Sequence, residues 1–133
     1  MNTQRRIRVY VAGAMTPTGH GNHAIEFLNN IRAGIKASIR LIKLGFTPVC
    51  PMLDFQYFLC AAPYEQINAG EIYDVSISLM LGCDVILLLP GAENSTGWKN
   101  EKEVADAEGI QVYYTHEELL FERAPGRINC QKV

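Results

Sequence analysis

The sequence contains no apolar run that approaches the ~20 residues of a membrane-spanning helix, and residues 1–8 are polar rather than signal-like. It also lacks an excess of positive charge, because its formal net charge is −2. A nucleic-acid polymer is therefore excluded as the expected ligand. We expect a cytoplasmic protein with no membrane partner. A small anionic ligand stays compatible with this charge, because a local site needs only a few donors.

Cysteine pairs at metal-binding spacing are absent. The four cysteines are Cys50, Cys60, Cys83 and Cys130. They form no Cys-x-x-Cys pair, and three lie in apolar surroundings, so we expect reduced thiols in the core. His20 and His23 have a spacing found in zinc sites, but no third or fourth ligand accompanies them. The sequence thus predicts no metal site.

Glycine-rich phosphate motifs are absent as well. The loop with Gly13, Gly19 and Gly21 does not match G-x-G-x-x-G, and no G-x-x-x-x-G-K-[ST] occurs. Loop flexibility alone accounts for these glycines. We expect no dinucleotide or other cofactor.

The 133 residues, 48% hydrophobic and 20% charged, have the composition of one soluble globular domain. The expected strands are residues 7–12, 46–51, 84–90 and 110–114, and the expected helices are 22–44, 71–82, 98–108 and 115–123. This alternation predicts an α/β fold, a doubly wound flavodoxin- or Rossmann-like parallel sheet with helices on both faces. We place the domain at 1–123 and a mobile tail at 124–133.

Local patterns support individual elements. The first helix has apolar residues at helical spacing and a stop at Gly45; these residues are Phe27, Ile31, Ile35, Ile39 and Ile42. Residues 84–90 are continuously apolar, which is typical of a strand covered on both faces. Thr115 and Glu118 predict a capping box for the last helix. The long connection 52–69 contains several aromatic residues, which favours a functional lid over disorder.

Ligands of such folds bind outside the carboxyl ends of the strands. Residues 12–16, 51–54 and 90–97 should share one cleft there. The substrate-binding residues predicted from this arrangement are Ala12, Gly13, Met15, Asp54, Phe55, Gly91, Asn94, Ser95 and Gly97. Residues 94–97 precede a helix, so their N–H groups and hydroxyls could hold a phosphate or a 5′-hydroxyl. Equally, Ser95 or Thr96 could simply cap the helix.

Glu101 is the carboxylate that the pattern singles out. At ~100° per residue it falls on the apolar side of its helix, which we expect to contain Trp98, Val104, Ala105 and Ala107. Lys99, Lys102, Glu103 and Asp106 fall on the other side. A carboxylate on an apolar face is costly unless it is paired or opens into a site. We predict a nucleophile; the alternative is an ordinary partner in a half-buried salt bridge.

Three aspartates are candidates for a second carboxylate. Asp84 begins the third strand, at the sheet edge away from the expected site, and is predicted to be structural. Asp54 follows the second strand at the expected site, while Asp74 lies on the helix before the third strand.

Three segments carry a family resemblance. They are V-Y-V-A-G-A-M-T at 9–16, C-D-V-I-L-L-L-P-G-A-E-N-S-T-G at 83–97 and E-K-E-V-A-D-A-E-G at 101–109. Together they resemble the nucleoside 2-deoxyribosyltransferase-like superfamily. Among its members, the chain looks most similar to the short bacterial and phage proteins with L-P-G-W-x-x-S-x-G-x-x-x-E. The resemblance covers residues 7–114.

The resemblance implies cleavage of the N-glycosidic bond of a nucleoside or nucleoside 5′-monophosphate, by hydrolysis or 2-deoxyribosyl transfer. Glu101 matches the nucleophile position and would form a covalent glycosyl ester. The family commonly uses an aspartate as the acid, but Ser76 occupies the aligned position here and Asp74 precedes it by two residues. The resemblance also implies a homo-oligomer with residues 56–64 near an interface.

Two other classes of function remain open from the sequence. One is a nucleotide-binding or sensing module with little or no catalytic activity, which the serine at position 76 would allow. The other is a flavodoxin-like interaction domain that binds no nucleotide.

Overall fold

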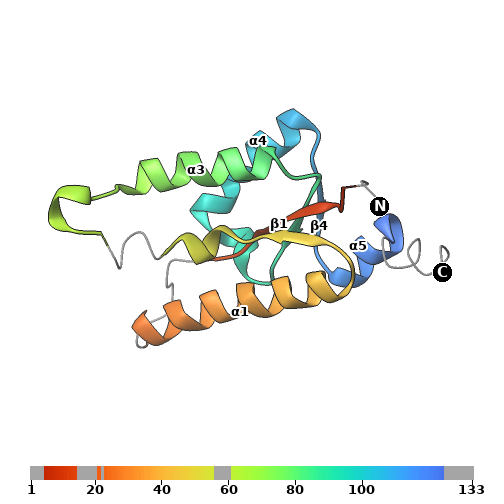
Figure 1. The fold of residues 1–133 in the computed structure, drawn as a ribbon, viewed down its shortest axis with the longest axis horizontal. Coiled ribbons are helices and arrows are strands. Elements are labelled where there is room, and N and C mark those ends of the chain that lie inside the picture. The colour runs from red at the N-terminus through yellow and green to blue at the C-terminus, as the bar shows by residue number, and fades with distance from the viewer. Residues whose placement is uncertain (1–4, 15–20, 22, 56–60, 125–133) are drawn as a thin grey trace.

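The computed structural model describes residues 5–14, 21, 23–55 and 61–124. These residues form a parallel sheet with the strand order β2-β1-β3-β4 (Figure 1). The strands are β1 (Arg8–Ala12), β2 (Thr47–Val49), β3 (Val85–Leu88) and β4 (Gln111–Tyr113). All three strand pairings are parallel. The predicted α/β parallel sheet is therefore confirmed.

Helices cover both faces of this sheet. They are α1 (His23–Lys43), α3 (Ala69–Leu81), α4 (Thr96–Glu108) and α5 (His116–Arg123). One core cluster joins α1 and α5 to the sheet, and a second joins α3 and α4 to its other face. Figure 1 shows α1 and α3 on opposite sides of β1. This arrangement is the doubly wound, flavodoxin-like one that the sequence predicts.

The chain reverses its direction across the sheet at β1 and β3. From β1 it crosses by α1 to β2 on one side, and from β3 it crosses by α4 to β4 on the other. Ala12 pairs with Leu88, so β1 and β3 end level with each other. Such a switch point is where open α/β sheets bind ligands.

Short 3-10 turns follow two strands and interrupt the long connection. They are η1 (Pro51–Phe55), η2 (Pro63–Glu65) and η3 (Ala92–Asn94). The predicted lid over 52–69 thus contains two local turns, and its residues 56–60 lie outside the described residues. The predicted tail also lies outside them from residue 125 onward.

The helix ends follow the capping rules. Asn68 accepts from the N–H of Glu71 at 2.8 Å, and the Glu71 carboxylate accepts from the N–H of Asn68 at 3.2 Å. At α5 the predicted cap is confirmed, because Thr115 Oγ1 accepts from the N–H of Glu118 at 3.1 Å. The Glu118 carboxylate, however, accepts from the N–H of Tyr114, one residue before the cap.

The apolar residues that predict α1 are only partly buried. Phe27 and Ile31 are half-buried, whereas Ile35, Ile39 and Ile42 are exposed. The face toward the sheet is built from Gly34, Ala37, Ser38 and Leu41. Small residues let α1 approach η1 closely, since a Cβ added at Gly34 would lie 2.8 Å from the sulfur of Met52. A separate apolar stripe is left on the outside of the helix.

The cysteine prediction holds where the structure describes it. Cys50 is a half-buried thiol and Cys83 a buried one, while Cys60 and Cys130 lie outside the described residues. Burial raises the pKa of Cys83 to about 11, which keeps it protonated. The part of the chain that the structure describes contains no cluster of three metal-ligating side chains. No helix within that part is both long and apolar enough to cross a bilayer.

Candidate functional site

The segments that follow β1, β2 and β3 leave the same edge of the sheet, as predicted. Leu89, directly after β3, donates its N–H to the carbonyl of Ala12 at 2.8 Å. Gly13 continues β1 and packs against Met52 of η1, because a Cβ there would lie 2.9 Å from the methionine sulfur. Gly13 therefore has a packing role at this edge, whatever it does for a ligand.

The start of α4 lies at this edge, beyond η3. Gly91 turns the chain after β3 with a φ of 87°, a conformation that favours glycine. Ser95 caps α4, because its Oγ accepts from the N–H of Trp98 at 3.2 Å. The capping interpretation of Ser95 is thus confirmed, and the anion interpretation stays a prediction. Apart from its own helix, no atom of the described residues lies within 4 Å of the point where a Cβ of Gly97 would be, so there is open space beside the first turn in this part of the chain.

Glu101 contacts Tyr10 inside the fold, a short distance before the carboxyl ends of the strands. The Tyr10 hydroxyl donates to Oε1 of Glu101 at 2.9 Å. Tyr10 is fully buried in the central strand β1, and Glu101 is half-buried on the second turn of α4. Tyr10 precedes the last residue of β1 by two positions, which sets the pair about 7 Å inside the carboxyl edge. The expected pairing of Glu101 is present, but its partner is a phenol rather than a cation.

Ser76 lies near this pair. It is buried on α3, and its proximity to the Tyr10 hydroxyl lowers the pKa of Tyr10, against the larger effects of burial and of Glu101. Three elements, α3, β1 and α4, therefore meet at this carboxylate.

The surroundings shift the proton affinities of these groups. Burial raises the pKa of Glu101 above its ordinary value, and the hydrogen bond from Tyr10 opposes that rise. Burial, and then the charge of Glu101, raise the pKa of Tyr10, so this phenol stays protonated as a donor. The charge of Glu101 also affects Tyr73 on α3: burial, and then this charge, raise the pKa of Tyr73. A carboxylate with a raised pKa and one fixed donor can act as a nucleophile or as a base.

The other predicted residues lie in several places. Asn94 is exposed in η3 and Ala12 is buried at the end of β1, while Asp74 is exposed on α3. Asp54 and Phe55 belong to η1, but their side chains lie outside the described part, as does all of Met15. Ala107 is exposed, so its predicted place on the apolar side of α4 is wrong. It lies about two and a half turns after Trp98, and therefore on the opposite, solvent side of the helix.

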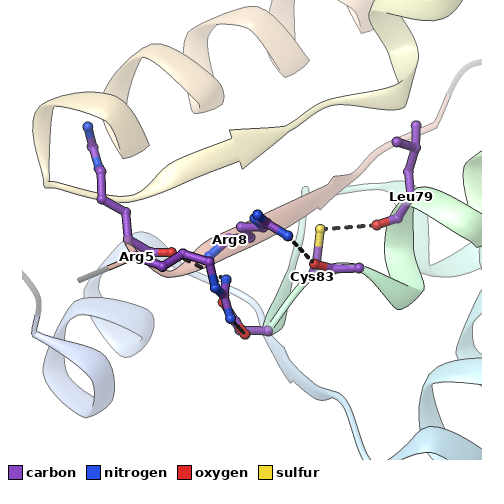
Figure 2. Close-up of polar contacts among 7 residues, drawn as sticks. Arg5, Arg8, Leu79 and Cys83 are labelled. Atoms are coloured by element: carbon purple, nitrogen blue, oxygen red, sulfur yellow. Dashed lines mark hydrogen bonds and ion pairs between the residues drawn. The ribbon is translucent and has the colours of Figure 1, made fainter. Parts of the chain in front are cut away.

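Asp84 lies at the opposite edge of the sheet, as predicted, and its contacts favour the structural role predicted for it. It accepts two hydrogen bonds from the Arg5 guanidinium, at 2.8 and 2.9 Å, and one from the N–H of Arg8 at 2.8 Å. The Arg5 guanidinium lowers the pKa of Asp84. Figure 2 shows Arg5 and Arg8 at this edge, near the bond from the Cys83 thiol to the Leu79 carbonyl at 3.3 Å.

The sequence prediction missed Tyr10, and it noted Ser76 only as a departure from a family pattern. A signal for Tyr10 was present, because it carries the one hydroxyl among the buried residues of β1, which are otherwise aliphatic. A buried phenol needs a hydrogen-bond partner. Sequence alone does not show that this partner is Glu101.

A comparison with known families yields a match over most of the chain. The family model described as Domain of unknown function (DUF4406) matches residues 7–114, which include all four strands and Glu101. Among curated proteins, none matches the chain at a significant level.

Proposed function

We propose that this chain, which belongs to the DUF4406 family, cleaves the N-glycosidic bond of a nucleoside or nucleoside 5′-monophosphate. The observation that carries the proposal is the half-buried Glu101, held by the Tyr10 hydroxyl at 2.9 Å beside the switch point of the sheet. Support also comes from the resemblance to nucleoside 2-deoxyribosyltransferases, in which Glu101 matches the nucleophile.

The proposed reaction begins with an attack by Glu101. The bond from Tyr10 holds Oε1 and leaves the second oxygen to attack the anomeric carbon. As the glycosyl ester forms, the bond to the base nitrogen breaks, and its electron pair leaves with the base, which takes up a proton. Water, or a second base, then attacks the anomeric carbon and restores the Glu101 carboxylate. The outcome is hydrolysis or transfer with retained configuration.

The proton for the leaving base requires a separate donor. We propose Asp74 or Asp54 for this role, because the Ser76 hydroxyl is a far weaker acid than a carboxyl group. Asp74 is exposed on α3, so it would serve a ligand that reaches the outer side of that helix. Replacing each aspartate by asparagine identifies the donor, because the loss should be smaller for nucleosides whose base leaves without protonation.

The rest of the proposal concerns the ligand and its setting. The first turn of α4, at Ser95 and Gly97, is proposed to hold the 5′ end of the ligand. We propose that the enzyme needs no cofactor, acts in the cytoplasm on a small molecule rather than a nucleic-acid polymer, and is a homo-oligomer.

A second candidate function is a nucleotide-binding or sensing module with little turnover. The buried Ser76 favours it, because this hydroxyl occupies the position where the resemblance leads us to expect an acid. The test is release of free base from all common nucleosides and their monophosphates, followed by chromatography. Release by the natural chain but not by Glu101→Gln supports the enzyme. Binding without release by either protein supports the module.

A further inference from the structure

α1 has an apolar stripe that does not face the sheet. The stripe consists of Ile25, Leu28, Ile35, Ile39 and Ile42, and each of these side chains is at least 39% exposed. The face toward the sheet is a different set, which includes Gly34, Ala37 and Leu41. A helix that has only water on its outer side usually presents polar residues there.

The spacing of the stripe is that of a helix pair. With Arg32, its members occupy positions 25, 28, 32, 35, 39 and 42, at alternating steps of three and four residues. This is the heptad spacing that aligns side chains along one side of a helix and packs them against a second helix. The stripe is about 26 Å long, which is most of the length of α1.

The other flank of α1 is already occupied. Arg40 forms an ion pair with Glu117 of α5, and His116 hydrogen-bonds to the Ala37 carbonyl at 3.2 Å. By helical spacing, the stripe lies on the flank of α1 away from these contacts. In the described part of the chain its side chains are exposed, so a second molecule can reach them there.

We propose that a second copy of this chain covers the stripe, in a two-fold dimer with antiparallel α1 helices. Alternating steps of three and four read the same in both directions, so a two-fold axis between Arg32 and Ile35 matches the stripe to itself. Leu28 then lies against Ile39 of the partner. A parallel pair would place the like charges of the two Arg32 side chains against each other. In the antiparallel pair, the aliphatic stem of Arg32 instead lies along the partner's Ile35.

The stripe is a sizeable apolar patch. It measures roughly a few hundred Å² per copy, and a patch of that size on a monomer is often functional. The aliphatic stems of Arg32, Lys36 and Lys43 lie beside it and extend the contact toward the ~600 to 800 Å² per partner of a specific interface. The stripe contains no residue of the proposed active site, so the dimer proposal can be tested independently of the enzymatic function.

Sedimentation equilibrium of the full chain tests the dimer at micromolar concentration. We expect a dimer for the natural chain and a monomer for the double variant Leu28→Glu with Ile39→Glu, a change of at least 100-fold in dissociation constant. Both side chains are more than half exposed, so the variant should keep its circular dichroism spectrum. Phe121→Glu is the matched control, because Phe121 is 76% exposed on α5, outside the stripe, and should leave the dimer intact.

Cysteine crosslinking tests the antiparallel arrangement. The double variant Leu28→Cys with Ile39→Cys should form a covalent dimer on mild oxidation, with the 28–39 link identified by peptide mass spectrometry. Leu28→Cys alone should not, because two copies of position 28 would lie about 16 Å apart along the helix axis. A monomeric natural chain, a dimer that survives both glutamates, or equal crosslinking by the single variant would each overturn the proposal.

Discussion

The Tyr10 hydroxyl and the Glu101 carboxylate, 91 positions apart in the sequence, meet through one hydrogen bond of 2.9 Å. This bond fixes one oxygen of a carboxylate whose pKa burial raises, and it opposes that rise. The buried strand thus controls both the orientation and the ionisation of Glu101. Removing the hydroxyl should change both.

Tyr10→Phe should lower kcat/KM by roughly 10- to 100-fold, the usual effect of losing one hydrogen bond to a charged group. It should also move the acid limb of the pH profile to higher pH, because nothing then opposes the effect of burial on the Glu101 pKa. The measurement is kcat/KM from about pH 4 to pH 9. Tyr113→Phe is the control, since that hydroxyl donates to the carboxylate of Glu122 on α5 at 2.6 Å. An unmoved acid limb would show that Tyr10 does not act on the carboxylate.

Ionisation of Glu101 should lower the stability of the folded protein. Its folded pKa lies above its ordinary value of 4.5, so the folded protein holds this proton more tightly than the unfolded chain. The associated stability is present below pH 4.5 and is lost as the pH rises through the folded pKa. Glu101→Gln should therefore raise the melting temperature at pH 7 by roughly 2 to 5 °C. At pH 4 the gain should vanish. Glu103→Gln, on the exposed side of α4, should show neither effect.

Gly97→Val tests where the 5′ end of a ligand binds. Outside the helix itself, the described residues place no atom within 4 Å of the added Cβ position, so the folded protein should tolerate the change. The new side chain would shield the N–H groups at the start of α4, which favour an anion. Calorimetry should show at least a 10-fold loss of affinity for a monophosphate and a much smaller loss for the matching nucleoside. Equal losses would place the phosphate elsewhere.

Asp84→Asn should affect stability and spare turnover. The Arg5 guanidinium lowers the pKa of Asp84, so its contribution is present above the unfolded pKa and is lost as the pH falls through the folded one. The side chain is 32% exposed, which limits the expected loss to about 1 kcal/mol at pH 7 by urea denaturation. Asp106→Asn, at an exposed pair with Lys102, should cost less. A fall in turnover at full stability would contradict the structural role of Asp84.

Local patterns in the sequence were sufficient to predict the fold. The continuous apolar run of β3 indicates a buried strand, and Thr115 marks the start of α5, because both signals depend on neighbouring residues. The sequence was a poorer guide to which face of α1 is buried. That helix has two apolar stripes, and only the close approach of η1 at Gly34 decides that the one with the small residues faces inward.

The candidate site could be predicted only in part. Glu101 could be identified from the sequence because a carboxylate on an apolar helix face is a local anomaly. Its contact with Tyr10 depends on strand order and register, as does the position of Ser76 near Tyr10, and neither follows from spacing along the chain. The choice between Asp54 and Asp74 as the acid is open for the same reason, since it depends on where a bound base would lie.

The most direct test of the central claim is a search for the covalent intermediate. The natural chain would be incubated with a slowly reacting 2-fluoro-substituted nucleoside, and its intact mass and its peptides measured. The account predicts an added sugar on the peptide that contains Glu101, and no addition to the Glu101→Gln protein. Release of free base with the sugar on another residue, or with Glu101→Gln as active as the natural chain, would contradict it.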